Sequence, residues 1–197
     1  MTGPSVPRRR APRATPAFEQ CVLDRGSPDR NGGLRGPRPR AAGRAASNGG
    51  HALSLSIQGA AAYAAELPAR ATLAGWVGRA LERPAELALV FVDGRSGRRL
   101  NREFRQRDYA TNVLTFSYHQ RPRVVADIVI CVPVARREAR QQRKTLRAHL
   151  AHLLLHGVLH AQGYDHQRGA DAARMQRREV ELLGALRIAD PYREPVE

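Results

Sequence analysis

The sequence predicts an α+β protein, in which a small mixed β-sheet of about four strands packs against about five helices. Three observations predict this class. Short apolar or alternating segments of strand length are mixed along the chain with longer segments of helical periodicity. A helical segment directly follows the first predicted strand. A further helix near the C-terminus carries several histidines, and we expect it to pack on one face of the sheet.

Four segments are predicted as strands. Residues 53–57 alternate apolar and polar side chains, which is the period of a half-buried strand. The other three are apolar segments, at 87–92, 111–118 and 126–132. The turn signal Asp93-Gly94 follows the second strand.

Five segments are predicted as helices. Apolar residues recur at helical spacing over about 69–83, and Ser96 can cap a helix that runs to about residue 105. Pro133 can begin a helix of about ten residues, because proline fits a first turn. Two further helices are expected over about 145–162 and 171–186.

Composition divides the chain of 197 residues into two parts. Residues 1–50 hold ten Arg, seven Pro and eight Gly with only three acidic residues, so we expect a disordered basic extension. It would either grip nucleic acid electrostatically or have no role. Residues 51–197 form the expected folded domain.

The formal net charge of +15 comes almost entirely from arginine, since Lys144 is the only lysine. Arginine binds phosphate in bidentate fashion, so RNA, DNA or the ribosome is a natural partner. A solvated arginine-rich surface explains the charge equally well. No apolar segment is long enough to span a membrane, and the two cysteines form no close pair. We therefore expect a cytoplasmic protein without a membrane partner.

One motif is more informative than the rest of the sequence. His156 and His160 are four residues apart and share one helix face, Gly163 can end that helix, and His166 follows in the turn. Three neutral imidazoles that converge in this way predict a zinc site with an open fourth position, as in catalytic zinc sites.

Two other interpretations of the motif stay open. The ligand spacing is that of metzincin peptidases, but the Glu that follows the first His in zinc peptidases is Gly157 here. The zinc could instead be structural, in a non-enzymatic ribosome-assembly factor, if Asp165 or His152 supplied a fourth ligand.

Four segments together resemble the YbeY family of bacterial endoribonucleases, which act in ribosomal RNA maturation. Residues 156–166 resemble its H-G-x-L-H-x-x-G-Y-D-H signature. The other three resemblances are 100–105 to L-N-x-x-[YF]-R, 111–116 to T-N-V-L-S-F and 126–130 to G-D-I-V-I. The departures are Ala126, where the family usually has Gly, and Ala161-Gln162, where an apolar pair is commoner.

The resemblance implies that His156, His160 and His166 hold Zn2+ and that Arg105 is the basic residue of the active site. It also implies a single-strand-specific endoribonuclease that matures the 3′ end of small-subunit ribosomal RNA and acts in ribosome quality control. The small ribosomal subunit and assembly factors would be its partners.

Two further residues are candidates for supporting roles. Asp165 either orients a ligand imidazole or caps its own turn. Asn101 either holds the site or substrate, or is structural. The nucleophile, zinc hydroxide or the RNA 2′-hydroxyl, stays open.

Overall fold

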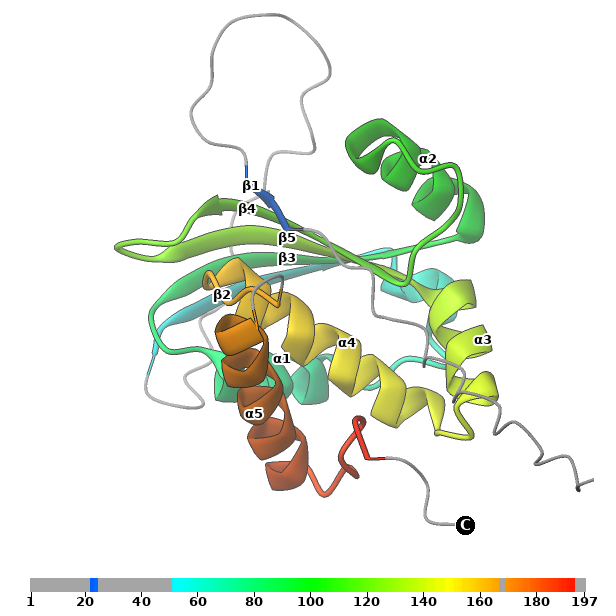
Figure 1. Cartoon of the computed structure of the whole chain (residues 1–197). Coiled ribbons are helices and arrows are strands. Elements are labelled where there is room, and N and C mark those ends of the chain that lie inside the picture. The colour runs from blue at the N-terminus through cyan, green and yellow to red at the C-terminus, as the bar shows by residue number, and fades with distance from the viewer. Residues whose placement is uncertain (1–21, 25–50, 167–168, 194–197) are drawn as a thin grey trace, which may run out of the picture.

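The computed structural model describes residues 22–24, 51–166 and 169–193 (Figure 1). Its strands are β1 (Val22–Asp24), β2 (Leu53–Gln58), β3 (Ala85–Val92), β4 (Val113–His119) and β5 (Val124–Cys131). Its helices are α1 (Arg70–Ala80), α2 (Gly94–Arg105), α3 (Val132–Gln141), α4 (Leu146–Ala161) and α5 (Gly169–Ala185), with a short 3-10 helix at Ala60–Tyr63. The predicted α+β class is confirmed, with each of the four strands and five helices expected within 51–197.

The sheet is mixed, as predicted, with strand order β1-β4-β5-β3-β2. Strands β2, β3 and β5 run parallel, while β4 is antiparallel to β5. The parallel pairs are joined by helical connections, which parallel strands require. This topology places β4 and β5 side by side, and α4 packs against both.

The sheet has one strand more than the sequence predicted. Strand β1 pairs with β4 in parallel, with Leu23 opposite Phe116. It belongs to the segment 1–50, for which we expected disorder throughout, and it is too short for apolar periodicity to reveal. The other residues of that segment lie outside the described residues, so the boundary at residue 50 stays a prediction.

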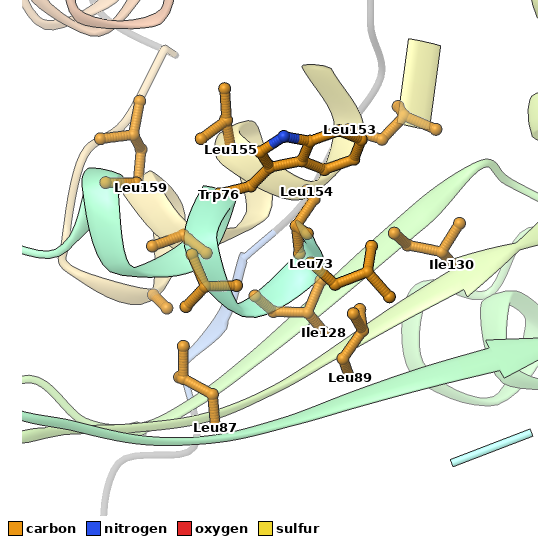
Figure 2. Packing of buried hydrophobic residues seen from close by; sticks show 14 of the residues in the cluster. Leu73, Trp76, Leu87, Leu89, Ile128, Ile130, Leu153, Leu154, Leu155 and Leu159 are labelled. Carbon is orange, nitrogen blue, oxygen red and sulfur yellow. The ribbon is translucent and has the colours of Figure 1, made fainter. Parts of the chain in front are cut away.

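The main core lies between one sheet face and the helices that cover it (Figure 2). Leu87 and Leu89 of β3 and Ile128 and Ile130 of β5 project from the sheet toward α1 and α4. The opposite face carries a smaller cluster around Phe116. There α2 packs on the sheet through residues that include Leu100 and Phe104.

Helix α4 is the central element of the helical layer. All residues from His149 to Ala161 are buried, because α1, α3, α5 and the sheet surround the helix. A helix that is apolar on every side is the type expected in a protein core. The histidines of this helix therefore lie in apolar surroundings. Among the described residues, no helix is both long and apolar enough to cross a lipid bilayer.

Candidate metal centre

Local signals in the sequence fix the two ends of α4. At its start the Thr145 side chain accepts a hydrogen bond of 3.1 Å from the Ala148 amide, which satisfies one of the unpaired amides of the first turn. At its end Gly163 has φ 94°, a left-handed conformation that glycine adopts without strain. The chain turns back at this glycine and returns His166 to the helix end.

The three predicted ligands converge at this end of α4. One ligand atom from each of His156, His160 and His166 lies within 4.8 Å of the other two. The ring centroids of His156 and His160 are 4.4 Å apart, and those of His160 and His166 are 5.0 Å apart. Among the described residues, no fourth His, Cys, Asp or Glu joins this group.

Hydrogen bonds at Nδ1 orient two of these rings. His160 Nδ1 donates to the Tyr164 carbonyl at 2.8 Å, and His156 Nδ1 donates to Glu179 Oε1. Each proton on Nδ1 leaves the lone pair on Nε2, the form in which imidazole binds a metal. Within the described part of the chain, the buried Nε2 atoms of His160 and His166 have no hydrogen-bond partner, which fits atoms placed for a metal.

Burial keeps the imidazoles of His156 and His160 neutral. Desolvation, with a smaller repulsion from His166, lowers the pKa of His156 to about 3. Desolvation also lowers the pKa of His160 to about 3, with neighbouring histidines adding to the effect. Metal ligation requires neutral imidazole. Three imidazole nitrogen donors around one point form a set that suits zinc.

Glu179 of α5 is a member of the site that the sequence did not reveal. Its side chain is fully buried, and Tyr192 from the segment after α5 donates a hydrogen bond to Oε2. His152 Nε2 lies 3.9 Å from Oε1. One oxygen of the carboxylate thus accepts a hydrogen bond from His156, and the other accepts one from Tyr192. Such a carboxylate fixes the tautomer and the orientation of a metal-ligating histidine.

The candidate Asp165 contributes to the turn after α4. Its Oδ1 accepts a hydrogen bond of 2.7 Å from the His166 amide, as in an Asp-stabilised turn. It therefore shapes the turn that returns His166 to α4. Neither Asp165 nor His152 belongs to the group formed by the three ligands among the described residues.

Arg105 and Asn101 come from α2, which covers the sheet face opposite α4. Asn101 is fully buried, and its Nδ2 donates to the Tyr109 carbonyl at 2.7 Å, which ties the loop after α2 to the helix. Arg105 ends α2 and is half-buried. The structure thus brings the three histidines together and places Arg105 on a separate element, so its role in the site stays a prediction.

Gly157 is a packing requirement of the site. A Cβ atom at this position would lie 2.9 Å from Ile128 Cγ2 and 3.2 Å from Thr115 Oγ1. The helix therefore touches the sheet at the residue where zinc peptidases carry their catalytic glutamate. A side chain at position 157 would point into the sheet, so this backbone has no room for that glutamate.

Gln162, one of the departures from the family pattern, links the end of α4 to the end of α1. Its Nε2 donates to the Ala80 carbonyl at 2.8 Å, and its Oε1 accepts from the Glu82 amide at 2.7 Å. The amide is buried and forms these bonds in place of apolar contact. They anchor the helix end from which the metal-binding turn departs.

Comparison with known proteins identifies the family to which the chain is similar. Residues 68–187 match the family described as Endoribonuclease YbeY. The chain is 53% identical over 141 residues to a Methylibium petroleiphilum protein named Endoribonuclease YbeY, covering 71% of this chain and 94% of that protein. It is 51% identical over 146 residues to a Polaromonas protein of the same name, with 71% and 94% covered. A solution structure of a Thermotoga maritima protein is similar at 22% identity and a TM-score of 0.45, covering 71% and 99%.

Proposed function

The chain belongs to the YbeY family of endoribonucleases, and on that premise we propose that it is a zinc-dependent endoribonuclease that cleaves single-stranded RNA. We extend the proposal to the biological role. The substrate would be the 3′ end of small-subunit ribosomal RNA, and the enzyme would act in ribosome quality control in the cytoplasm. The small ribosomal subunit and its assembly factors would be the partners.

The observation that carries the zinc proposal is the convergence of three imidazoles, two of which have Nδ1 fixed by a hydrogen bond. His156, His160 and His166 would hold the ion, and Glu179 and the Tyr164 carbonyl would orient two of the rings. Zinc bound there would polarise a phosphoryl oxygen and lower the pKa of a bound water to about 7. Either that water or the RNA 2′-hydroxyl would attack the phosphorus.

Charge supports a polyanionic substrate. Helix α2 carries five arginines, Arg95, Arg98, Arg99, Arg102 and Arg105, against the single acid Glu103. We propose that Arg105 contacts the RNA backbone and offsets negative charge that spreads over the phosphate in the transition state. Single strands would be preferred, because a flexible backbone can follow a cleft that a stiff duplex cannot enter.

Gly157 argues against the peptidase alternative. Zinc peptidases use the glutamate at that position to take and pass a proton, and contact with Ile128 and Thr115 leaves no room for a glutamate side chain here. The structural-zinc alternative is disfavoured by the lack of a fourth protein ligand among the described residues.

The test is cleavage of a labelled single-stranded RNA by purified zinc-loaded protein, with a peptide substrate assayed in parallel. We expect RNA cleavage that a chelator abolishes and added zinc restores, and no peptide cleavage. The Arg105→Ala variant should lose RNA cleavage while it retains zinc and fold. A His156→Ala protein purified in the same way controls for contaminating ribonuclease. Peptide cleavage, or RNA cleavage that survives chelation, contradicts the proposal.

A further inference from the structure

A cavity separate from the three-histidine centre opens at the other end of α4. It encloses about 450 Å³ between the first turns of α4, the end of α5 and the segment that follows α5. Its wall is apolar on the α5 side, where Leu183, Leu186 and Ile188 line it. This volume is within the range of small-ligand pockets.

Three cations surround this cavity. Lys144, Arg147 and Arg187 all line it, and no aspartate or glutamate does so among the described residues. Arg147 stacks on Trp76, with its guanidinium carbon 5.2 Å from the ring centroid. Lys144 is half-buried and donates to Gln142 Oε1 at 3.1 Å, a neutral acceptor. The nearby acid Asp190 attracts Lys144 electrostatically and lies 3.6 Å from Arg193. An apolar wall with a cationic rim fits a ligand that has a flat apolar part and an anionic part.

The cavity and the candidate active site lie at opposite ends of α4. His149 and His152 line the cavity, and on a helix they lie on the same face as His156 and His160. Ala148 at the cavity and His160 at the metal centre are separated by about 18 Å along the helix axis, at 1.5 Å per residue. A mononucleotide is too short to reach both places, whereas an RNA strand of several nucleotides is long enough.

We propose that this cavity is a subsite for the single-stranded RNA substrate, in which one nucleotide remote from the scissile bond places its base against the apolar wall and its phosphate against Lys144 and Arg187. The inference rests on the proposed function, since it assumes that RNA is the substrate. Binding at two separated points increases affinity for strands that span both, because the second contact becomes intramolecular.

The composition of the chain allows a direct test. Lys144 is the only lysine, so acetylation of an ε-amine can occur at one place, and mass spectrometry can follow it without ambiguity. The probe is a 2′-O-methyl single-stranded oligoribonucleotide, which lacks the 2′-hydroxyl, added to the full-length zinc-loaded protein. We expect the oligonucleotide to slow acetylation of Lys144 about tenfold. A duplex of the same sequence should not do so, because its bases are stacked and paired.

A pair of variants provides the second measurement. Lys144→Gln should weaken oligonucleotide binding by about tenfold, the value of one lost charge-assisted contact. Arg140→Gln removes the same charge from an exposed residue of α3 that does not line the cavity, and should change binding less than twofold. Zinc content should stay the same in both. In RNA cleavage, Lys144→Gln should raise KM and leave kcat unchanged.

The outcomes separate this inference from the proposed function. If the protein cleaves RNA but the oligonucleotide leaves Lys144 acetylation unchanged, or if both variants bind equally, the subsite is wrong and the endoribonuclease stands. If Lys144 is protected and the protein cleaves no RNA, the subsite stands and the proposed chemistry is wrong.

Discussion

The two halves of α4 each carry a pair of buried histidines, and the pairs have different surroundings. In the first half, His149 Nε2 is 2.9 Å from Glu138 Oε2, which also accepts a hydrogen bond of 3.0 Å from Asn112. In the second half, His156 and His160 make their hydrogen bonds through Nδ1. In His149, a protein group therefore engages Nε2. In His156 and His160, Nε2 is directed toward His166.

This difference shows which property distinguishes a candidate ligand from a core histidine. Burial does not, because His149, His152, His156 and His160 are all at most 3% exposed. A low pKa does not either, because desolvation lowers the pKa of His152 to about 3, as it does for His156. The distinguishing property is which ring nitrogen the surrounding protein occupies, and that depends on residues from α3, α5 and the turn after α4.

The largest expected effect is on metal content. His160→Ala should reduce bound zinc from about one ion per chain to a small fraction, because two imidazoles hold zinc much more weakly than three. His149→Ala should retain the zinc of the parent protein, since Glu138 engages that ring. Metal analysis after dialysis measures both. Equal zinc loss in the two variants would mean that the halves of the helix do not differ as described.

The next effect concerns the carboxylate behind His156. Glu179→Gln keeps the shape of the side chain but weakens its hold on the Nδ1 proton, so zinc affinity should fall about 10- to 100-fold. Glu181→Gln is the matched control, because Glu181 lies on the same helix and makes an exposed ion pair with Arg178. Competition with a chromogenic chelator measures both affinities. Equal zinc affinities in the two variants would mean that Glu179 does not support the metal centre.

The same comparison explains what the sequence could and could not predict. The three ligands lie within eleven residues, 156–166, so helix periodicity and one glycine were enough to bring them together. Glu179 lies 23 residues beyond His156, on a helix whose place against α4 depends on tertiary packing. Tyr192 is more distant still. No local spacing links either residue to the histidines.

The fold was predictable for a similar reason. The four predicted strands and five predicted helices of 51–193 have patterns that match their periods, and these patterns located all nine to within a few residues, although the short 3-10 helix at Ala60–Tyr63 was not predicted. Strand β1 has only three residues in a segment rich in Arg, Pro and Gly, so its pattern carries no signal. Its existence depends on the free edge of β4, which only the folded sheet presents.

A third prediction concerns stability instead of metal content. His149→Ala should reduce stability although it retains zinc, because it empties a fully buried site and removes the imidazole partner of Glu138. We expect a loss of about 2–4 kcal/mol in the free energy of unfolding. Urea denaturation in the presence of a chelator measures it, since bound zinc would stabilise the folded state by an amount that depends on its affinity. A change below about 0.5 kcal/mol would indicate that the Glu138 contact is not structural.

The smallest expected effect concerns the side of α4 that faces the sheet. Alanine is a better helix former than glycine by about 1 kcal/mol, so Gly157→Ala would stabilise an isolated helix. Here the added methyl meets Ile128 Cγ2 at 2.9 Å, and crowding a packed core costs about 1–3 kcal/mol. The two effects partly cancel, so we expect a net loss of about 0–2 kcal/mol.

Gly75→Ala isolates the helix propensity, because Gly75 lies within α1 and an added Cβ meets nothing within 4 Å. That variant should be more stable than the parent by about 0.5–1 kcal/mol. The difference between the two free energies of unfolding then measures the contact between α4 and the sheet. If Gly157→Ala were stabilised as much as Gly75→Ala, the sheet would leave room at position 157, and the steric argument against a catalytic glutamate there would fail.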